Sequence, residues 1–176
     1  MLSSLSIEVG APPELVYGLA RDVERWALLL PHYSRSRRVR DEGDGQLVVD
    51  FVARRSLVGV LGLGLPVAWR ARTWSEPATL RLRFVHVAGV TRGMDVTWRI
   101  EPTAAGCHVA IEHVFRRRLP VPFLGAQLGD ELLPAFVDRF FTRPIARRTL
   151  ATFQALAEAI AGPATSDKAP RTYPFT

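Results

Sequence analysis

The chain has 176 residues, of which 48% are hydrophobic and 23% are charged, a composition typical of a globular domain with one core. Its formal charge of +6 would favour anionic partners, but Lys168 is the only lysine, and such an arginine bias reflects GC-rich coding as much as nucleic-acid binding. The longest apolar run, residues 57–68, contains Pro66 and is shorter than the roughly 20 residues of a membrane-spanning helix, which excludes such a span.

The first predicted elements are one strand and two short helices. Apolar and polar residues alternate up to residue 9, which predicts a strand. Pro12 and Pro13 suit the first turn of a helix, where a missing N–H costs nothing. A second helix over residues 23–30 is predicted to have Asp22 as its N-cap and to end before Pro31.

Six further strand-length runs follow, at residues 35–41, 46–53, 67–74, 80–87, 94–100 and 108–116. The Gly43-Asp44-Gly45 sequence predicts a hairpin between the first two. The runs that begin at Leu80 and Met94 have one apolar and one charged face, which indicates an antiparallel sheet covered on a single side.

A long C-terminal helix is predicted to cover that side, because apolar residues recur at helical spacing between residues 130 and 161. Pro134 is compatible with its first turn, whereas Pro144 is expected to kink or divide it. Gly162 and Pro163 end the helix, and residues 163–176 are predicted to be a flexible tail. The predicted fold is α+β, with a curved antiparallel sheet of six to seven strands around the long helix, in one domain over residues 1–162.

A bent sheet wrapped on a single helix leaves space that inward side chains line, and this space selects an apolar ligand. The predicted ligand-binding residues on the strands are Leu82, Phe84, Met94, Val96, Trp98, Ile111, His113 and Phe115, and those on the helix are Phe136, Phe140 and Phe141.

Three stretches resemble a known family. Residues 7–17 read Ile-Glu-Val-Gly-Ala-Pro-Pro-Glu-Leu-Val-Tyr and are followed by Asp-Val-Glu-Arg-Trp at 22–26 and by Leu30-Pro31. The Gly-Asp-Gly turn is the second stretch, and Leu-Pro-Val-Pro-Phe-Leu-Gly at 119–125 is the third. Over residues 5–161 the chain thus resembles the START-like, or Bet v 1-like (SRPBCC), superfamily, in its bacterial polyketide cyclase/dehydrase and lipid-transport branch.

The resemblance implies a helix-grip fold whose cavity holds a lipid, an isoprenoid quinone or a polyketide, with no cofactor. It also implies that Trp26, Tyr33 and Trp69 lie at the pocket. Aromatase/cyclases of this branch have an arginine on the central strand, which would be Arg72 here, unless the pairing is shifted by one residue onto Thr73.

Tyr33, Arg72 and His113 are the candidates for catalysis. A neutral imidazole can act as a general acid or base near neutral pH. No carboxylate at a fixed spacing is visible to orient His113, so the alternative is that His113 is a hydrogen-bonded residue of the cavity wall. His86 and His108 also lie on predicted strands and are weaker candidates for catalysis. Because Cys107 is the only cysteine and has no adjacent histidine cluster, we predict no disulfide and no metal site.

The glycine-rich run at residues 57–65 lacks the glycine order of a dinucleotide site and the Lys-Ser/Thr pair of a phosphate loop. It is interpreted as a cavity lid, a membrane contact or a plain connection.

Arginines at 35–40, 116–118 and 139–147 suit a solvated surface, an anionic membrane or an acidic carrier protein, whereas nucleic acid is not predicted. The N-terminus has no secretion signal, so a cytoplasmic location is expected.

Three functions remain open. The first is non-enzymatic binding or carriage of an apolar small molecule, which predicts a cavity lined almost wholly by carbon atoms. The second is a polyketide aromatase/cyclase that promotes aldol ring closure, which predicts two or more convergent polar groups inside the cavity. The third is an interaction module that modulates a protein or ribosomal partner, which predicts a small or filled cavity.

Overall fold

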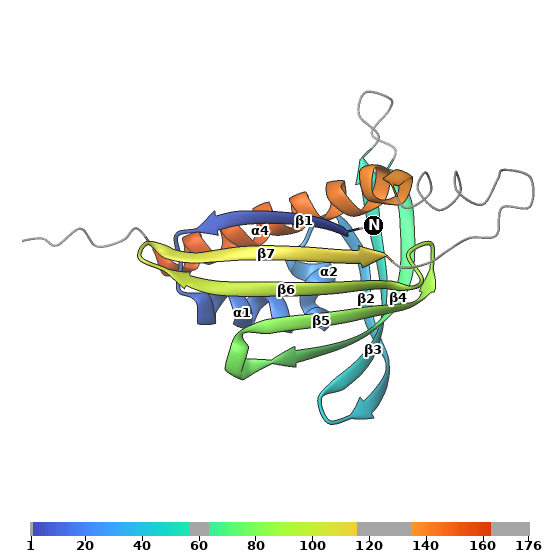
Figure 1. The fold of residues 1–176 in the computed structure, drawn as a ribbon, viewed down its shortest axis with the longest axis horizontal. Coiled ribbons are helices and arrows are strands. Elements are labelled where there is room, and N and C mark those ends of the chain that lie inside the picture. Colours follow the sequence, from blue (N-terminus) through green and yellow to red (C-terminus); the bar gives the residue numbers. More distant parts are fainter. Residues whose placement is uncertain (1, 57–63, 116–134, 163–176) are drawn as a thin grey trace, which may run out of the picture.

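The computed structural model describes residues 2–56, 64–115 and 135–162 (Figure 1). Its elements are β1 (Leu2–Val9), α1 (Pro13–Arg21), η1 (Val23–Arg25), α2 (Trp26–Leu29), β2 (Tyr33–Gly43), β3 (Gln46–Ser56), β4 (Gly64–Glu76), η2 (Pro77–Thr79), β5 (Arg81–Gly89), β6 (Met94–Thr103), β7 (Gly106–Phe115), η3 (Asp138–Thr142) and α4 (Arg143–Ala161). Here η1 and η2 are 3-10 turns and η3 is a π-helical turn.

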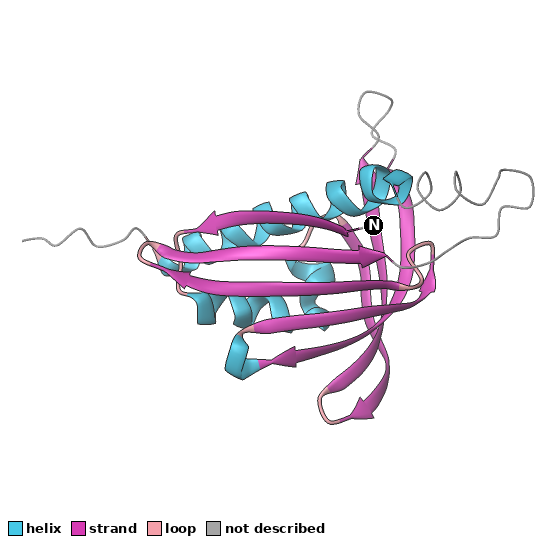
Figure 2. Ribbon diagram, viewed as in Figure 1, coloured by secondary structure: helices cyan, strands magenta, loops and turns pink. Residues whose placement is uncertain are grey.

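The seven strands form one antiparallel sheet in the order β1-β7-β6-β5-β4-β3-β2, so β1 and β2 are its edges. The sheet is curved, and α1, α2 and α4 lie on one side of it (Figures 1 and 2). The α+β fold predicted from the sequence, with two short helices after the first strand and a long C-terminal helix, is confirmed.

Alternation of side chains along the strands decides which residues reach the core. On β6, Met94, Val96 and Trp98 are buried, while the residues between them are half-buried on the other face. β7 alternates in the same way along its whole length. Because successive side chains of a strand point to opposite faces, each strand supplies one inward row that packs against the helices.

The chain between β1 and β2 differs from the prediction in one detail. Asp22 makes no side-chain cap, and the second helix is split into η1 and the short α2. Asp22 instead forms an exposed ion pair of 3.3 Å with Arg25. The segment is held by Trp26, whose buried indole Nε1–H donates a hydrogen bond of 2.9 Å to the carbonyl oxygen of Ala20.

The predicted interruption of the C-terminal helix at Pro144 is present as a π-helical turn. Residues 135–137 are α-helical, η3 follows, and α4 then begins with Pro144 in its first turn. Proline has no N–H to bond to the carbonyl four residues earlier, which is that of Phe140, so the regular ladder cannot continue there. Another small difference is Leu80, predicted as the first strand residue, which ends η2 with a positive φ of 49°.

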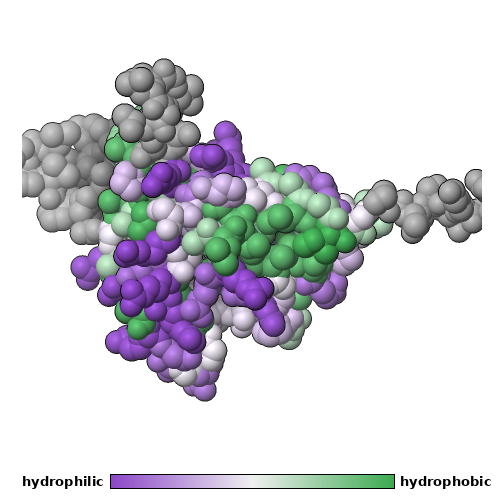
Figure 3. All heavy atoms as spheres, turned by 180° about the vertical axis from the view of Figure 1, so that it is seen from behind, coloured by the Kyte–Doolittle hydropathy of each residue, from purple (hydrophilic) through white to green (hydrophobic). Residues whose placement is uncertain are grey.

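The two ends of the molecule differ in surface character. Seen from behind, the side covered by helices shows a broad apolar area, whereas the end that carries the β2–β3 hairpin is mainly hydrophilic (Figure 3).

Within the described ranges, no helix is both long and apolar enough to cross a membrane. Several predicted features lie outside the described residues, namely the tail at 163–176, loop residues 57–63, Pro134 and the arginines at 116–118.

Candidate functional site

A cavity of about 70 Å³ lies between the inner face of the sheet and the start of the C-terminal helix. Its apolar walls come from the inward rows of β3 to β7, from Trp26 and Tyr33, and from η3 and α4. Ten of the predicted ligand-binding residues line it: Trp26, Tyr33, Trp69, Phe84, Met94, Val96, Trp98, Ile111, His113 and Phe141.

Four predicted ligand-binding residues lie elsewhere. Leu82 and Phe115 are buried in the core without lining the cavity. Phe136 is 47% exposed, and its ring stacks on that of Phe140 at a centroid distance of 4.5 Å. A π turn holds more residues than an α turn, so the stripe extrapolated at regular helical spacing is rotated across η3 and Phe141 faces the cavity.

Arg72 was predicted as a catalytic candidate, and the structure places it on the outer face of β4. Its Nε donates a hydrogen bond of 2.5 Å to Glu42 Oε2, and its side chain is 43% exposed. The neighbouring Thr73 is buried. The shift by one residue that would remove the arginine from the pocket is therefore the arrangement found, because Trp69, Ala71 and Thr73 share the inner face.

The cavity is bounded on one side by a cluster of aromatic rings centred on Trp26. Five rings lie with centroids 5.4–5.9 Å from that of the indole, those of Tyr33, Phe51, Phe84, Trp98 and Phe153. Edge-to-face and tilted ring pairs at such distances contribute roughly 0.5–1.5 kcal/mol each beyond the burial of their area. This wall is therefore rigid, and it presents aromatic faces to whatever occupies the cavity.

His86 is a polar group of the cavity wall. Its Nδ1 hydrogen-bonds to Thr91 Oγ1 at 2.6 Å, and its ring stacks on Trp69 with centroids 5.8 Å apart and planes at 11°. Burial lowers the pKa of His86 to about 3, and repulsion from a protonated His113 acts in the same direction. At neutral pH this imidazole is uncharged, so it can act as a hydrogen-bonding group beside the aromatic wall.

His113 and Thr142 also line the cavity, from β7 and η3 respectively. Both side chains are more than nine-tenths buried, and neither His113 Nδ1 nor Thr142 Oγ1 has a hydrogen-bond partner within the described part of the chain. Burial lowers the pKa of His113 to about 4, an effect that the nearby Asp138 partly opposes and that Arg143 reinforces. A buried polar atom without a partner costs roughly 1–3 kcal/mol, so these two atoms need an explanation.

His32 and Thr149 form a third polar group, next to Tyr33. His32 Nε2 lies 2.9 Å from Thr149 Oγ1, and this hydroxyl donates to the carbonyl oxygen of Ile145 at 2.9 Å. Because the single hydroxyl proton of Thr149 is used in that way, it accepts from the Nε2–H tautomer of His32. Burial raises the pKa of Tyr33 and a hydrogen bond with Thr149 opposes the rise, while burial and then Arg148 lower the pKa of His32 to about 4.

The sequence interpretation missed several wall residues, among them Phe51, Thr91, Thr142 and Thr149. Phe51 could have been found, because Val49, Phe51 and Ala53 alternate on β3 as the inward residues of the other strands do. The threonines carry no such signal. No group of three metal-ligating side chains occurs among the described residues.

The chain matches a known protein family over most of its length. Residues 3–158 fit the sequence profile of the family described as "Polyketide cyclase / dehydrase and lipid transport". The chain belongs to this family. The resemblance inferred from three short stretches of sequence is thereby confirmed.

Solved structures agree with membership of the polyketide cyclase/dehydrase and lipid transport family. The Zhui aromatase/cyclase from a Streptomyces species has a TM-score of 0.68 and 21% identity, covering 94% of this chain and 98% of that one. The protein TTHA0849 from Thermus thermophilus has a TM-score of 0.69 and 22% identity, covering 92% and 100%. A START superfamily protein from Mycobacterium smegmatis has a TM-score of 0.59 and 14% identity, covering 88% and 98%. At these identities the likeness shows the shared fold, and no curated protein matches the chain in sequence.

Proposed function

We propose that the protein binds an apolar, oxygen-bearing small molecule of the polyketide class in the cavity between the sheet and the C-terminal helix. The observation that carries this proposal is that two buried atoms in the wall of a largely apolar cavity, His113 Nδ1 and Thr142 Oγ1, have no hydrogen-bond partner among the described residues. A ligand ketone or hydroxyl oxygen would give these atoms the hydrogen bonds that they lack. A pure hydrocarbon ligand would leave them unpaired.

The cavity must open for such a ligand to enter. Its volume of about 70 Å³ holds a few water molecules, whereas pockets for drug-sized ligands measure roughly 300–1,000 Å³. Two residues of the wall are half-buried, Trp69 and Phe141, and of these Phe141 lies in the π turn. We infer that Phe141 moves outward when ligand binds.

The small volume is also what an interaction module with a filled cavity would have. Such a module, however, would gain stability from apolar residues at positions 113 and 142, where the chain instead has two polar groups without a partner in the described part of the chain. Stability given up at one place in a protein is commonly associated with a functional site. Ligand binding therefore explains more of the site than a module does.

Analysis of what the purified protein carries tests this proposal. Native mass spectrometry of the purified protein, followed by organic extraction, is expected to show a bound apolar compound that contains ketone or hydroxyl oxygen. An extract that contains only hydrocarbon, or a protein that binds no aromatic ketone when soaked with it, would count against the proposal.

A second candidate function is aldol cyclisation of a poly-β-ketone, which the convergent polar groups favour. In such a reaction a base removes a proton from a methylene between two ketones, and the resulting enolate carbon attacks a second carbonyl carbon. The alkoxide formed then takes back the proton. His86 and His113 are the available bases, and Tyr33, kept protonated by the burial that raises its pKa, is an available proton donor.

The low pKa values of the two histidines weaken this second candidate. A base with a pKa of about 3 or 4 holds a proton poorly, which favours a hydrogen-bonding role over proton abstraction. The decisive test is incubation with a synthetic polyketone. Conversion into a single ring pattern, lost in His113→Gln, would support cyclisation, and unchanged polyketone would support binding alone.

A further inference from the structure

The outer face of the sheet is unevenly charged. On β6 and β7 the outward charged residues include Asp95, Arg99, Glu101 and Glu112, and Arg99 is paired with Glu112 at 2.8 Å. Over β2 to β4, five of the outward arginines surround two carboxylates: Arg35, Arg37, Arg40, Arg70 and Arg72, with Glu42 and Asp50. We call this second region the arginine face, and it lies on the opposite side of the sheet from the cavity.

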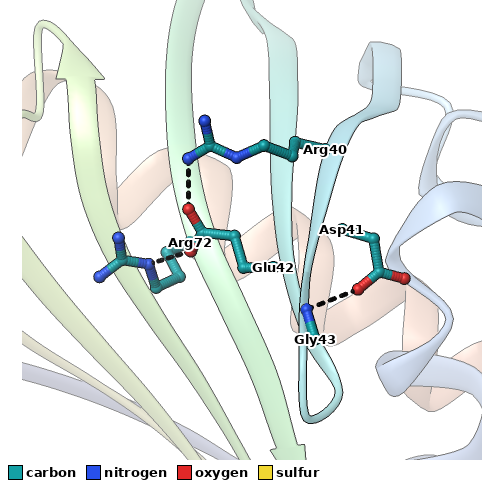
Figure 4. Close-up of polar contacts among 5 residues, drawn as sticks. All are labelled: Arg40, Asp41, Glu42, Gly43 and Arg72. Carbon is teal, nitrogen blue, oxygen red and sulfur yellow. Dashed lines mark hydrogen bonds and ion pairs between the residues drawn. The ribbon is translucent and has the colours of Figure 1, made fainter.

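Each of the two carboxylates of the arginine face is already paired with arginine. Glu42 lies between Arg40 and Arg72 and accepts a hydrogen bond from each (Figure 4). Arg70 donates through Nε and a terminal nitrogen to the two oxygens of Asp50, at 2.6 and 3.0 Å. These arginines hold the pKa of both carboxyl groups below the usual range. Arg70 thus binds its carboxylate in a forked geometry, and Arg40 and Arg72 each donate one hydrogen bond to theirs.

Two arginines of this face have no ion-pair partner within the described residues. Arg35 and Arg37 are exposed on β2 and lie close enough to Asp50 to lower its pKa, but the Asp50 carboxylate is held by Arg70. Protection of an exposed sheet edge is a common reason for charge on a strand such as β2. It does not explain Arg70 and Arg72, because β4 is an interior strand.

The arginine face is also hollowed. A groove of about 440 Å³ runs across it, bordered by Arg40, Arg70 and Arg72 with Val48, Val87 and Ala88 among its lining residues. A groove with charged rims and an apolar component suits an extended segment that carries both acidic and small apolar side chains. A membrane surface is flat and would not enter such a groove, and its described lining residues include none of the stacking aromatic residues typical of single-stranded nucleic-acid sites.

We propose that the arginine face is a docking surface for an acidic segment of a partner protein. The segment's carboxylates pair with Arg35 and Arg37, and its apolar side chains contact the valines of the groove. Because the cavity lies on the other side of the sheet, the partner and the cavity ligand can bind at the same time. This proposal does not depend on the identity of that ligand.

A fluorescein-labelled glutamate-rich peptide is the probe, and fluorescence anisotropy is the measurement. The double variant Arg35→Glu with Arg37→Glu should weaken peptide binding at least tenfold, and wild-type binding should fall steeply as salt rises from about 50 to 200 mM. The matched control is Arg92→Glu with Arg147→Glu, which changes the net charge equally at two exposed positions without an ion-pair partner in the described ranges. This control should bind the peptide nearly as well as the wild type.

An equal loss in both double variants would overturn the proposal, since net charge alone would then explain the binding. Absence of peptide binding at low salt would overturn it as well. Vesicles of phosphatidylcholine and phosphatidylglycerol are measured in parallel. Binding of vesicles that depends on Arg35 and Arg37, with no binding of peptide, would overturn the proposal and show that the arginine face contacts a membrane.

Discussion

Ser3 Oγ donates a hydrogen bond of 2.7 Å to Asp138 Oδ1, so the first strand is tied to the π-helical turn 135 residues later in the sequence. The other carboxylate oxygen of Asp138 accepts a hydrogen bond of 2.5 Å from Arg143 Nε. Ser3 is also the residue of β1 directly opposite His113 on β7. This network therefore holds η3, which carries Thr142, against the strand pair that carries His113.

Ser3→Ala removes one partner of this buried carboxylate. The variant should lose about 1–3 kcal/mol of unfolding free energy, because a hydrogen bond to a buried charged group is removed. Urea denaturation followed by circular dichroism measures the loss. Ser4→Ala, at the exposed neighbouring position, is the control and should change stability by less than about 0.5 kcal/mol. Equal effects of the two substitutions would show that the Asp138 contact contributes nothing.

Thr142→Val is expected to stabilise the ligand-free protein. Valine has nearly the shape of threonine, and the substitution removes a buried hydroxyl without a described partner, so a gain of about 1 kcal/mol is expected. In a domain of this size that gain raises Tm by about 2–4 °C. Thr149→Val is the matched control and should lower Tm, because the Thr149 hydroxyl hydrogen-bonds to His32 and to Ile145. A lower Tm for Thr142→Val would mean that its hydroxyl has a partner.

Stability should fall as pH is lowered from about 6.5 to 5. His32, His86 and His113 have pKa values lowered to about 4, 3 and 4, so the unfolded chain binds protons at these sites before the folded protein does. The stability that depends on the uncharged imidazoles is complete above the unfolded pKa of about 6.5. It is then lost at up to about 1.4 kcal/mol per pH unit for each histidine.

Urea midpoints at several pH values measure this slope. His32→Gln should flatten it, whatever the substitution does to stability at pH 7, because one of the three titrating groups is gone. A flat profile of the wild type between pH 6.5 and 5 would show that these imidazoles are not buried.

Strand residues of the site could be predicted from the sequence because the alternation of side chains between the two faces of a strand depends only on the geometry of the backbone. Met94, Val96 and Trp98 follow from it directly. The same alternation places Trp69 and Thr73 on the inner face and Arg72 on the outer face. The resemblance to cyclases instead suggested Arg72 as the residue at the pocket.

Helix residues of the site could not be predicted with the same success. Phe136, Phe140 and Phe141 are all predicted there from regular spacing, but the π turn before Pro144 changes the rotation per residue, and only Phe141 of the three lines the cavity. The atoms of His113 and Thr142 that lack a described partner are likewise a property of tertiary packing. No spacing in the sequence brings β7 and η3 together.

Phe141→Ala should enlarge the cavity and admit a larger ligand. The half-buried phenyl ring lines the cavity, so its loss should cost about 2 kcal/mol, less than the 3–5 kcal/mol of a fully buried phenylalanine. Binding of 2-acetylanthracene, followed by quenching of tryptophan fluorescence, should tighten. Phe136→Ala, which removes an aromatic ring off the cavity, is the control and should leave binding unchanged. Weaker binding in Phe141→Ala would show that the ring holds the ligand and does not exclude it.

The most direct test of the oxygen-binding cavity compares 2-acetylnaphthalene with 2-isopropylnaphthalene, which has a similar shape but no oxygen. Trp26, Trp69 and Trp98 line the cavity, so quenching of intrinsic fluorescence reports both titrations. The ketone should bind about tenfold more tightly, corresponding to one hydrogen bond worth about 1.4 kcal/mol, and Thr142→Val should reduce this preference. Equal affinity for the two compounds in the wild type would contradict the account.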